Sequence, residues 1–227
     1  MMRDHYDDSL TLRDAVAAYF AENHFGPDGG YSDAWVKLKL GPLRLFMPNT
    51  PARVAAVRFH DLHHIVTGYR TDWRGEFEIS AWELAAGCGR FYAAWWLNLG
   101  ALNAGLLVCP RRTLQAFFLG RRSRSLYGEM YDATLLAKTV QDARAAMGLS
   151  PDGKAVGSKH GMLGTLGDVA VLTAYYLASI PVALLTLLAS IFVFVPVALL
   201  QTARQPAGAA ASAQQHDGAN SAPPVAT

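Results

Sequence analysis

The sequence predicts a mainly α-helical protein: a helical bundle with a small β-hairpin, followed by a C-terminal transmembrane or hairpin helix segment. Three observations support this fold class. Apolar residues recur at helical spacing within residues 10–24. The segment Pro51–Thr67 has sequence signals for both ends of a helix. The run Val169–Ala203 contains no Asp, Glu, Lys, Arg or His, which is typical of a membrane segment.

The N-terminal part of the chain predicts one helix and one hairpin. Within residues 10–24, Leu12, Val16 and Tyr19 fall on one side of a helix. Residues 36–45 alternate between apolar and other side chains on both sides of a central Gly-Pro pair. A period of two predicts two short antiparallel strands here.

The segment Pro51–Thr67 has the clearest helix boundaries. Thr50 is a good N-cap, Pro51 stands where proline is favoured as the first helical residue, and Gly68 follows the last periodic position. We therefore expect a helix with these bounds, and it carries three histidines.

Further helices are expected downstream. The apolar sequence predicts one long helix over residues 76–108, which Pro110 stops. Residues 111–124 contain five arginines, and residues 131–147 have the pattern of another amphipathic helix.

The C-terminal third suggests a membrane segment and a tail. The predicted parts are a helical domain (1–150), a linker (151–167), a membrane segment (168–203) and a disordered tail (204–227). As a helix, the uncharged run would be roughly 50 Å long, whereas one crossing of the hydrocarbon core needs about 20 residues. Pro181 can kink a single span or turn a shallow hairpin, and the sequence leaves both options open.

Composition excludes several classes of protein. The 227 residues are only 17% charged, with a formal net charge of +2, so charge does not suggest a nucleic-acid partner. Cys88 and Cys109 have no ligand spacing, and we expect buried thiols rather than a disulfide. The acidic first residues are unlike a signal peptide, so the mature chain is expected to provide its own membrane attachment.

The most informative segment is His60-Asp61-Leu62-His63-His64, followed after eleven residues by Glu76. On a helix, His60 and His64 project side by side, as two imidazoles must to share one ion. Asp61 and His63 lie on opposite flanks of that face. If the next helix packs antiparallel, Glu76 lies near the level of His64. Nitrogen and carboxylate ligands suit Zn²⁺, Mn²⁺, Co²⁺ or Fe²⁺, of which we favour Zn²⁺.

Other interpretations of the histidines are weaker. Single histidines on helices are usually surface or satisfied core residues, but three within five positions are harder to explain in that way. A zincin protease has Glu after its first His, where this chain has Asp61. A membrane di-iron desaturase needs several His boxes. The remaining histidines are scattered singly, so the ligand count does not fit that class.

The motif resembles the metal motif of the coenzyme Q biosynthesis protein 4 family. His60-Asp61-x-x-His64, eleven residues and then Glu76, preceded by Gly75, agrees with the family spacing at every position. The stretches Gly120–Tyr127 and Val140–Arg144 are similar to the family's basic stretch and closing helix. The resemblance covers roughly residues 50–150. The C-terminal apolar segment and His63 are not part of the family pattern.

The resemblance implies a role in ubiquinone biosynthesis. One divalent ion would be held by His60, Asp61, His64 and Glu76, with Glu83 or His63 as proton carrier or orienting residue. The implied reaction is metal-dependent, oxidative decarboxylation at C1 of a polyprenylated ring derived from 4-hydroxybenzoate. The alternative is a nonenzymatic polyprenyl-lipid-binding scaffold for the biosynthetic enzymes.

We also expect contact with lipids. The arginines of residues 111–124 favour anionic headgroups over substrate. Aromatic residues would line a route for a polyprenyl tail or simply form helix core; these are Trp82, Phe91, Tyr92, Trp95 and Trp96. The expected location is the bacterial cytoplasmic membrane, with the globular domain on its cytoplasmic side. The expected partners are the polyprenylated aromatic precursor, membrane lipids and other ubiquinone biosynthesis enzymes.

Overall fold

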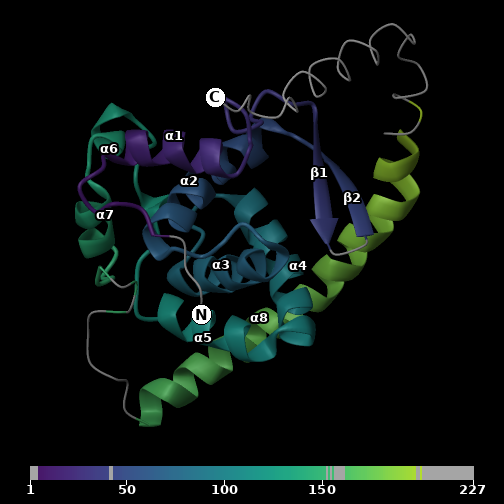
Figure 1. The fold of residues 1–227 in the computed structure, drawn as a ribbon. Coiled ribbons are helices and arrows are strands. Elements are labelled where there is room, and N and C mark those ends of the chain that lie inside the picture. The colour runs from purple at the N-terminus through teal and green to yellow at the C-terminus, as the bar shows by residue number, and fades with distance from the viewer. Residues whose placement is uncertain are drawn as a thin grey trace, which may run out of the picture.

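The computed structural model is mainly helical, with one two-stranded antiparallel hairpin and one long apolar C-terminal helix (Figure 1). This confirms the predicted fold class. The structure describes residues 5–40, 43–151, 153, 155, 162–197 and 200. In chain order, the elements are α1 (Leu12–Glu22), β1 (Trp35–Leu40), β2 (Leu43–Pro48), α2 (Pro51–Thr67), α3 (Trp73–Ala86), α4 (Tyr92–Val108), α5 (Pro110–Gly120), the 3-10 helix η1 (Leu126–Gly128), α6 (Ala133–Leu136), α7 (Val140–Ala146), α8 (Met162–Ala189) and the π-helical turn η2 (Ser190–Phe194).

The predicted helix Pro51–Thr67 is confirmed with both of its ends. The Thr50 hydroxyl accepts a hydrogen bond from the Arg53 amide at 3.2 Å, and Pro51 is the first helical residue. Gly68 ends the helix in the left-handed region, with φ of 72°. A residue with a side chain is strained there, which explains why glycine follows the helix.

The prediction of one helix over residues 76–108 was wrong. The structure divides this segment into α3 and α4. Gly87 and Gly89 adopt φ values of 99° and 52°, which interrupt the helical path. The α3 helix also begins earlier, because Asp72 caps its first turn by accepting from the Arg74 and Gly75 amides.

Two downstream boundaries also differ from expectation. Pro110 is the first residue of α5 rather than only a stop, because proline is tolerated where its missing N–H would be unsatisfied anyway. The expected helix over residues 131–147 is two short helices. Thr139 separates them by capping α7, where its hydroxyl accepts from the Asp142 amide at 3.0 Å.

The α3 helix is the centre of the bundle and packs against both α4 and α5. Two glycines permit this close packing. A Cβ on Gly105 would lie 2.8 Å from the Cβ of Phe77, and one on Gly120 would lie 2.3 Å from the carbonyl oxygen of Trp82. Trp82 is fully buried and belongs to this core. The packing fixes α3 beside α2, which matters for the site below.

The α8 helix runs along the outside of the bundle (Figure 1). Residues Gly164–Val197 form a helix long and apolar enough to cross a membrane, and almost none of its most apolar part is buried. Pro181 lies inside this helix and does not turn it into a hairpin. Residues 162–167, expected as linker, are already helical. The expected disordered tail, 204–227, lies outside the described residues.

The α8 helix is tied to the bundle through α4 and α5. The rings of Trp95 and Tyr175 have centroids 5.8 Å apart, and the Asn103 amide donates to the Ser179 hydroxyl at 3.3 Å. Near the start of α8, Arg121 forms an ion pair of 2.8 Å with the buried Asp168. The remaining surface of α8 is largely apolar and exposed.

Candidate metal centre

Three of the predicted ligands converge between α2 and α3. His60 Nε2 lies 3.1 Å from His64 Nε2 and 3.3 Å from Glu76 Oε2. His64 Nε2 lies 3.4 Å from Glu76 Oε1. One ligand atom from each residue falls within a group no more than 4.8 Å across. The spacing in the sequence predicted this convergence.

Local structure explains why the three residues meet. His60 and His64 are one helical turn apart on α2. Glu76 reaches them from the first turn of α3 because the connecting loop packs tightly against that turn. A Cβ on Gly75 would lie only 1.9 Å from the Arg70 carbonyl oxygen, so only glycine allows this approach.

Both imidazoles are oriented through their other nitrogen. His64 Nδ1 donates to the Tyr69 carbonyl oxygen at 2.8 Å, and His60 Nδ1 donates to Glu83 Oε1 at 3.0 Å. Metal-binding histidines commonly use such a partner to fix their tautomer and ring orientation. With both Nδ1 atoms engaged, the Nε2 atoms are the nitrogens available to a ligand.

The charges of the cluster depend on one another. Burial disfavours a charged His60, but the carboxylates of Glu83 and Glu76 raise its pKa well above the ordinary value. Burial similarly acts against ionised Glu76, yet the neighbouring His64 and His60 lower its pKa to about 2. His60 Nε2 therefore faces both His64 Nε2 and the Glu76 carboxylate.

Glu83 is a fully buried carboxylate with four hydrogen-bond donors. Its Oε1 accepts from His60 Nδ1 at 3.0 Å and from His63 Nδ1 at 2.6 Å. Its Oε2 accepts from Asn98 at 2.6 Å and from the Tyr127 hydroxyl at 3.0 Å. Although burial opposes ionisation, His60 and His63 hold the pKa of Glu83 far below its usual range. Of the two predicted roles, the geometry favours orientation of His60 over proton transfer.

His63 is completely buried and uses both ring nitrogens. Nδ1 donates to Glu83, and Nε2 accepts from the Leu126 amide at 2.9 Å. Burial lowers the pKa of His63, which keeps the ring neutral. Its position supports a role in holding Glu83 and the η1 segment, and places it outside the cluster of converging ligands.

Asp61, the fourth predicted ligand, also lies outside that cluster. Its carboxylate accepts from the Tyr31 hydroxyl at 2.5 Å and from the Tyr19 hydroxyl at 3.5 Å. The physical reason is helical geometry, since Asp61 is rotated by about 100° from His60. The Tyr19 ring in turn stacks on His64, with centroids 5.8 Å apart.

Several residues that hold the site were not identified from the sequence. Tyr31 and the Tyr69 carbonyl gave no signal, because their contacts depend on how loops fold over α2. Asn98 and Tyr127 gave a partial signal: Asn98 is a polar residue in an apolar helix, and Tyr127 lies in the basic stretch that resembles the family. Both bind Glu83 rather than the cluster itself.

The residues present fit one divalent metal ion. Two imidazoles and one carboxylate are three protein ligands, which leaves positions open for water or substrate, as in catalytic rather than structural sites. The exposed side is at Glu76, whose side chain is 40% exposed, whereas His64 is 1% exposed. No protein-family model matches the chain, and no curated protein or solved structure gives a significant match. The case for a metal site at these residues therefore comes from their geometry.

Proposed function

We propose that the protein binds one divalent metal ion through His60, His64 and Glu76 and acts in ubiquinone biosynthesis. The proposed reaction is decarboxylation at C1 of a polyprenylated ring derived from 4-hydroxybenzoate. The observation that carries the metal site is the convergence of the two Nε2 atoms with the Glu76 carboxylate, each imidazole being held through Nδ1. The ring substrate is proposed from the family resemblance of the motif.

The donor set supports Zn²⁺ first, with Mn²⁺, Co²⁺ or Fe²⁺ as alternatives. Asp61 can act as a fourth ligand only if its carboxylate gives up its hydrogen bonds from Tyr31 and Tyr19. We therefore propose three protein ligands, with Asp61 supporting His64 through the Tyr19 ring.

The bound ion would act as a Lewis acid towards the carboxylate or phenolate of the ring. His60, His64 and Glu76 would hold it on the exposed side of α2, and Glu83 would keep His60 in the required orientation. Decarboxylation breaks the bond between C1 and the carboxyl carbon and releases CO₂. Replacement of the carboxylate by a hydroxyl group takes oxygen from water and passes two electrons to an acceptor outside the chain.

The membrane setting of the proposal depends on the apolar C-terminal helix. A polyprenylated precursor resides in the bilayer, and α8 would hold the metal centre beside it. We propose the bacterial cytoplasmic membrane, with the globular domain on the cytoplasmic side. Membrane lipids and other ubiquinone biosynthesis enzymes are the proposed partners.

The alternative is a nonenzymatic scaffold that binds polyprenyl lipids and organises the biosynthetic enzymes. The exposed aromatic side chains of α4 favour this alternative, because Tyr92 and Trp96 are available to lipid whether or not a metal is bound. The two functions differ in whether the metal ligands are needed for product formation.

The first experiment is elemental analysis of the detergent-purified protein, with His64→Ala as the test variant and His24→Ala as the control. His24 is exposed and lies outside the cluster. Wild type and His24→Ala should contain roughly one equivalent of a divalent metal, and His64→Ala should lose it. No metal in the wild type would overturn the proposal.

The second experiment uses a polyprenylated substrate with an isotopic label in its carboxyl group. Release of labelled CO₂ by the wild type but not by His64→Ala would support the enzyme. Metal binding without CO₂ release, together with polyprenyl compounds that co-purify with both proteins, would favour the scaffold.

A further inference from the structure

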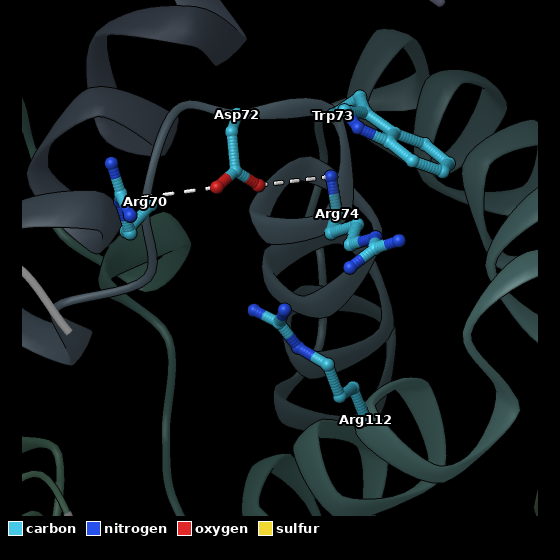
Figure 2. A pocket seen from close by; sticks show the side chains of 5 residues that line it. All are labelled: Arg70, Asp72, Trp73, Arg74 and Arg112. Atoms are coloured by element: carbon cyan, nitrogen blue, oxygen red, sulfur yellow. Dashed lines mark hydrogen bonds and ion pairs between the residues drawn. The ribbon is translucent and has the colours of Figure 1, made fainter. Parts of the chain in front are cut away.

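A second candidate site lies on the other side of α3 from the metal centre. A surface pocket of about 330 Å³ is lined by Arg70, Asp72, Trp73, Arg74 and Arg112 (Figure 2). Arg112 forms an ion pair with Glu78, two residues after Glu76. Because positions i and i+2 are on nearly opposite sides of a helix, Glu78 and Arg112 lie on the side of α3 away from Glu76.

The lining of the pocket carries a net positive charge, from three arginines against one carboxylate. Asp72 is its only lining carboxylate, and that carboxylate is already engaged. One oxygen caps α3 by accepting from the Arg74 and Gly75 amides at 3.0 and 2.9 Å, and the other lies 3.8 Å from Arg70 Nε. Asp72 therefore serves to position the loop and Arg70.

Arg74 is the guanidinium most available to a ligand. Within the described part of the chain, it forms no ion pair, and its side chain stacks against the Trp73 ring with the guanidinium carbon 5.0 Å from the centroid. Figure 2 shows that the Arg74 and Arg112 side chains both line the pocket. Like charges that line one pocket favour a bound anion there, and Arg74 adds a charge that Glu78, the partner of Arg112, does not offset.

Exposed apolar residues precede Arg112 closely in the sequence. Leu107 and Val108, at the end of α4, are 73% and 49% exposed, and Arg112 follows shortly after them. The α4 helix approaches Phe77 at Gly105. The centroids of the Phe77 and Trp73 rings are 5.8 Å apart. Arginines and a tryptophan beside exposed aliphatic residues are typical of a membrane interface.

We infer that this pocket binds a phosphate group through Arg70, Arg74 and Arg112. The planar guanidinium fork matches the oxygens of a phosphate and remains charged at every physiological pH. The phosphate can belong to a phospholipid headgroup or to a soluble anion, and the neighbouring Leu107 and Val108 favour the headgroup. The inference is independent of the metal centre.

The test uses the full chain in a nonionic detergent, titrated with inorganic phosphate and separately with dihexanoylphosphatidylglycerol. Arg74→Gln is the test variant because Arg74 has no ion pair to lose. Arg112→Gln is unsuitable, since it would leave the buried Glu78 without its partner. Arg90→Gln is the matched control: Arg90 is exposed and is stacked on Phe91 at 5.4 Å, in the same way as Arg74 on Trp73.

We expect isothermal titration calorimetry to detect binding to the wild type and to Arg90→Gln with equal affinity. Arg74→Gln should bind roughly tenfold more weakly, the effect of losing a charged hydrogen-bond donor, and should keep its metal. Tighter binding of the lipid than of inorganic phosphate would identify a headgroup, and equal binding would identify a soluble phosphate. If neither probe binds the wild type, or if Arg90→Gln is weakened as much as Arg74→Gln, the inference is wrong.

Discussion

At the scale of single residues, the metal centre is an arrangement of donors around two Nε2 atoms. His60 and His64 each present Nε2 because a carboxylate or carbonyl holds Nδ1. A proton on His60 Nε2 would face both His64 Nε2 and the Glu76 carboxylate. A metal ion would take the place of that proton, and this exchange can be measured.

Metal binding should release a proton from His60. Glu83 and Glu76 raise the pKa of His60 well above its ordinary value, so we expect a metal ion to displace a proton from His60 when it binds. Zinc affinity should therefore fall by up to about tenfold per unit as the pH falls below that raised pKa. Calorimetry in two buffers of different protonation enthalpy should give different heats of metal binding. Their difference should correspond to the release of roughly one proton per metal ion. Identical heats would show that metal-free His60 is already neutral.

Glu83 should control metal affinity without being a ligand. In Glu83→Gln, the His60 ring loses its charged acceptor, and we expect metal affinity to fall by about 10- to 100-fold. Competition with a chelator would measure this change, and circular dichroism would confirm that the variant is folded. Glu129→Gln is the control, since Glu129 is exposed and, among the described residues, forms an ion pair with Lys138 at 3.6 Å. An unchanged affinity in a folded Glu83→Gln protein would contradict the orienting role.

At the scale of helices and strands, the sequence predicted element boundaries correctly where the residues that determine them are close together in the chain. The bounds of α2 followed from Thr50, Pro51 and Gly68, because caps act within one helical turn. The division between α3 and α4 was missed, since nothing local requires Gly87 and Gly89 to adopt left-handed conformations. A glycine in an apolar run is also compatible with a continuous helix.

The same distinction applies to the site. The pair His60 and His64 and the later Glu76 were predictable from spacing. The environment of Asp61 was not, because its partners Tyr19 and Tyr31 come from α1 and from the loop before β1. Such contacts depend on how distant segments pack, which no local pattern in the sequence records.

The loop between α2 and α3 should tolerate no side chain at position 75. In Gly75→Ala, the new Cβ would meet the Arg70 carbonyl oxygen, so the backbone must shift and displace Glu76. We expect a loss of about 1–3 kcal/mol in the free energy of unfolding, together with weaker metal binding. Chemical denaturation and chelator competition measure the two effects.

The control for that substitution is Gly100→Ala in α4. A Cβ at Gly100 meets no atom within 4 Å, and alanine favours helix over glycine. Gly100→Ala should therefore be neutral or slightly stabilising, with unchanged metal affinity. A Gly75→Ala protein that behaves like Gly100→Ala would show that the loop is not packed as described.

At the scale of the whole molecule, the protein combines a helical bundle with an apolar helix that the bundle does not bury. The cluster residues belong to α2 and α3, whereas α8 packs against α4. One face of α8 contacts the bundle, through residues that include Asp168, Tyr175 and Ser179. On the remaining surface, Leu177 and Leu184 are 60% and 56% exposed. If the proposed membrane attachment and metal binding both hold, this arrangement makes them separable.

Charged residues in the middle of α8 should therefore release the protein from membranes and leave its metal in place. Leu177→Arg combined with Leu184→Arg adds two charges near the centre of the apolar run, each costing about 2.5–3.5 kcal/mol in a bilayer. Because both side chains point away from the bundle, the metal content per folded protein should not change. The same two positions changed to Ala provide the control, which should remain in the membrane pellet after carbonate extraction.

A double-Arg variant that stays in that pellet would show that other surfaces, such as α4, hold the protein on the bilayer. Loss of metal on release would instead mean that the bilayer helps to keep α2 and α3 together.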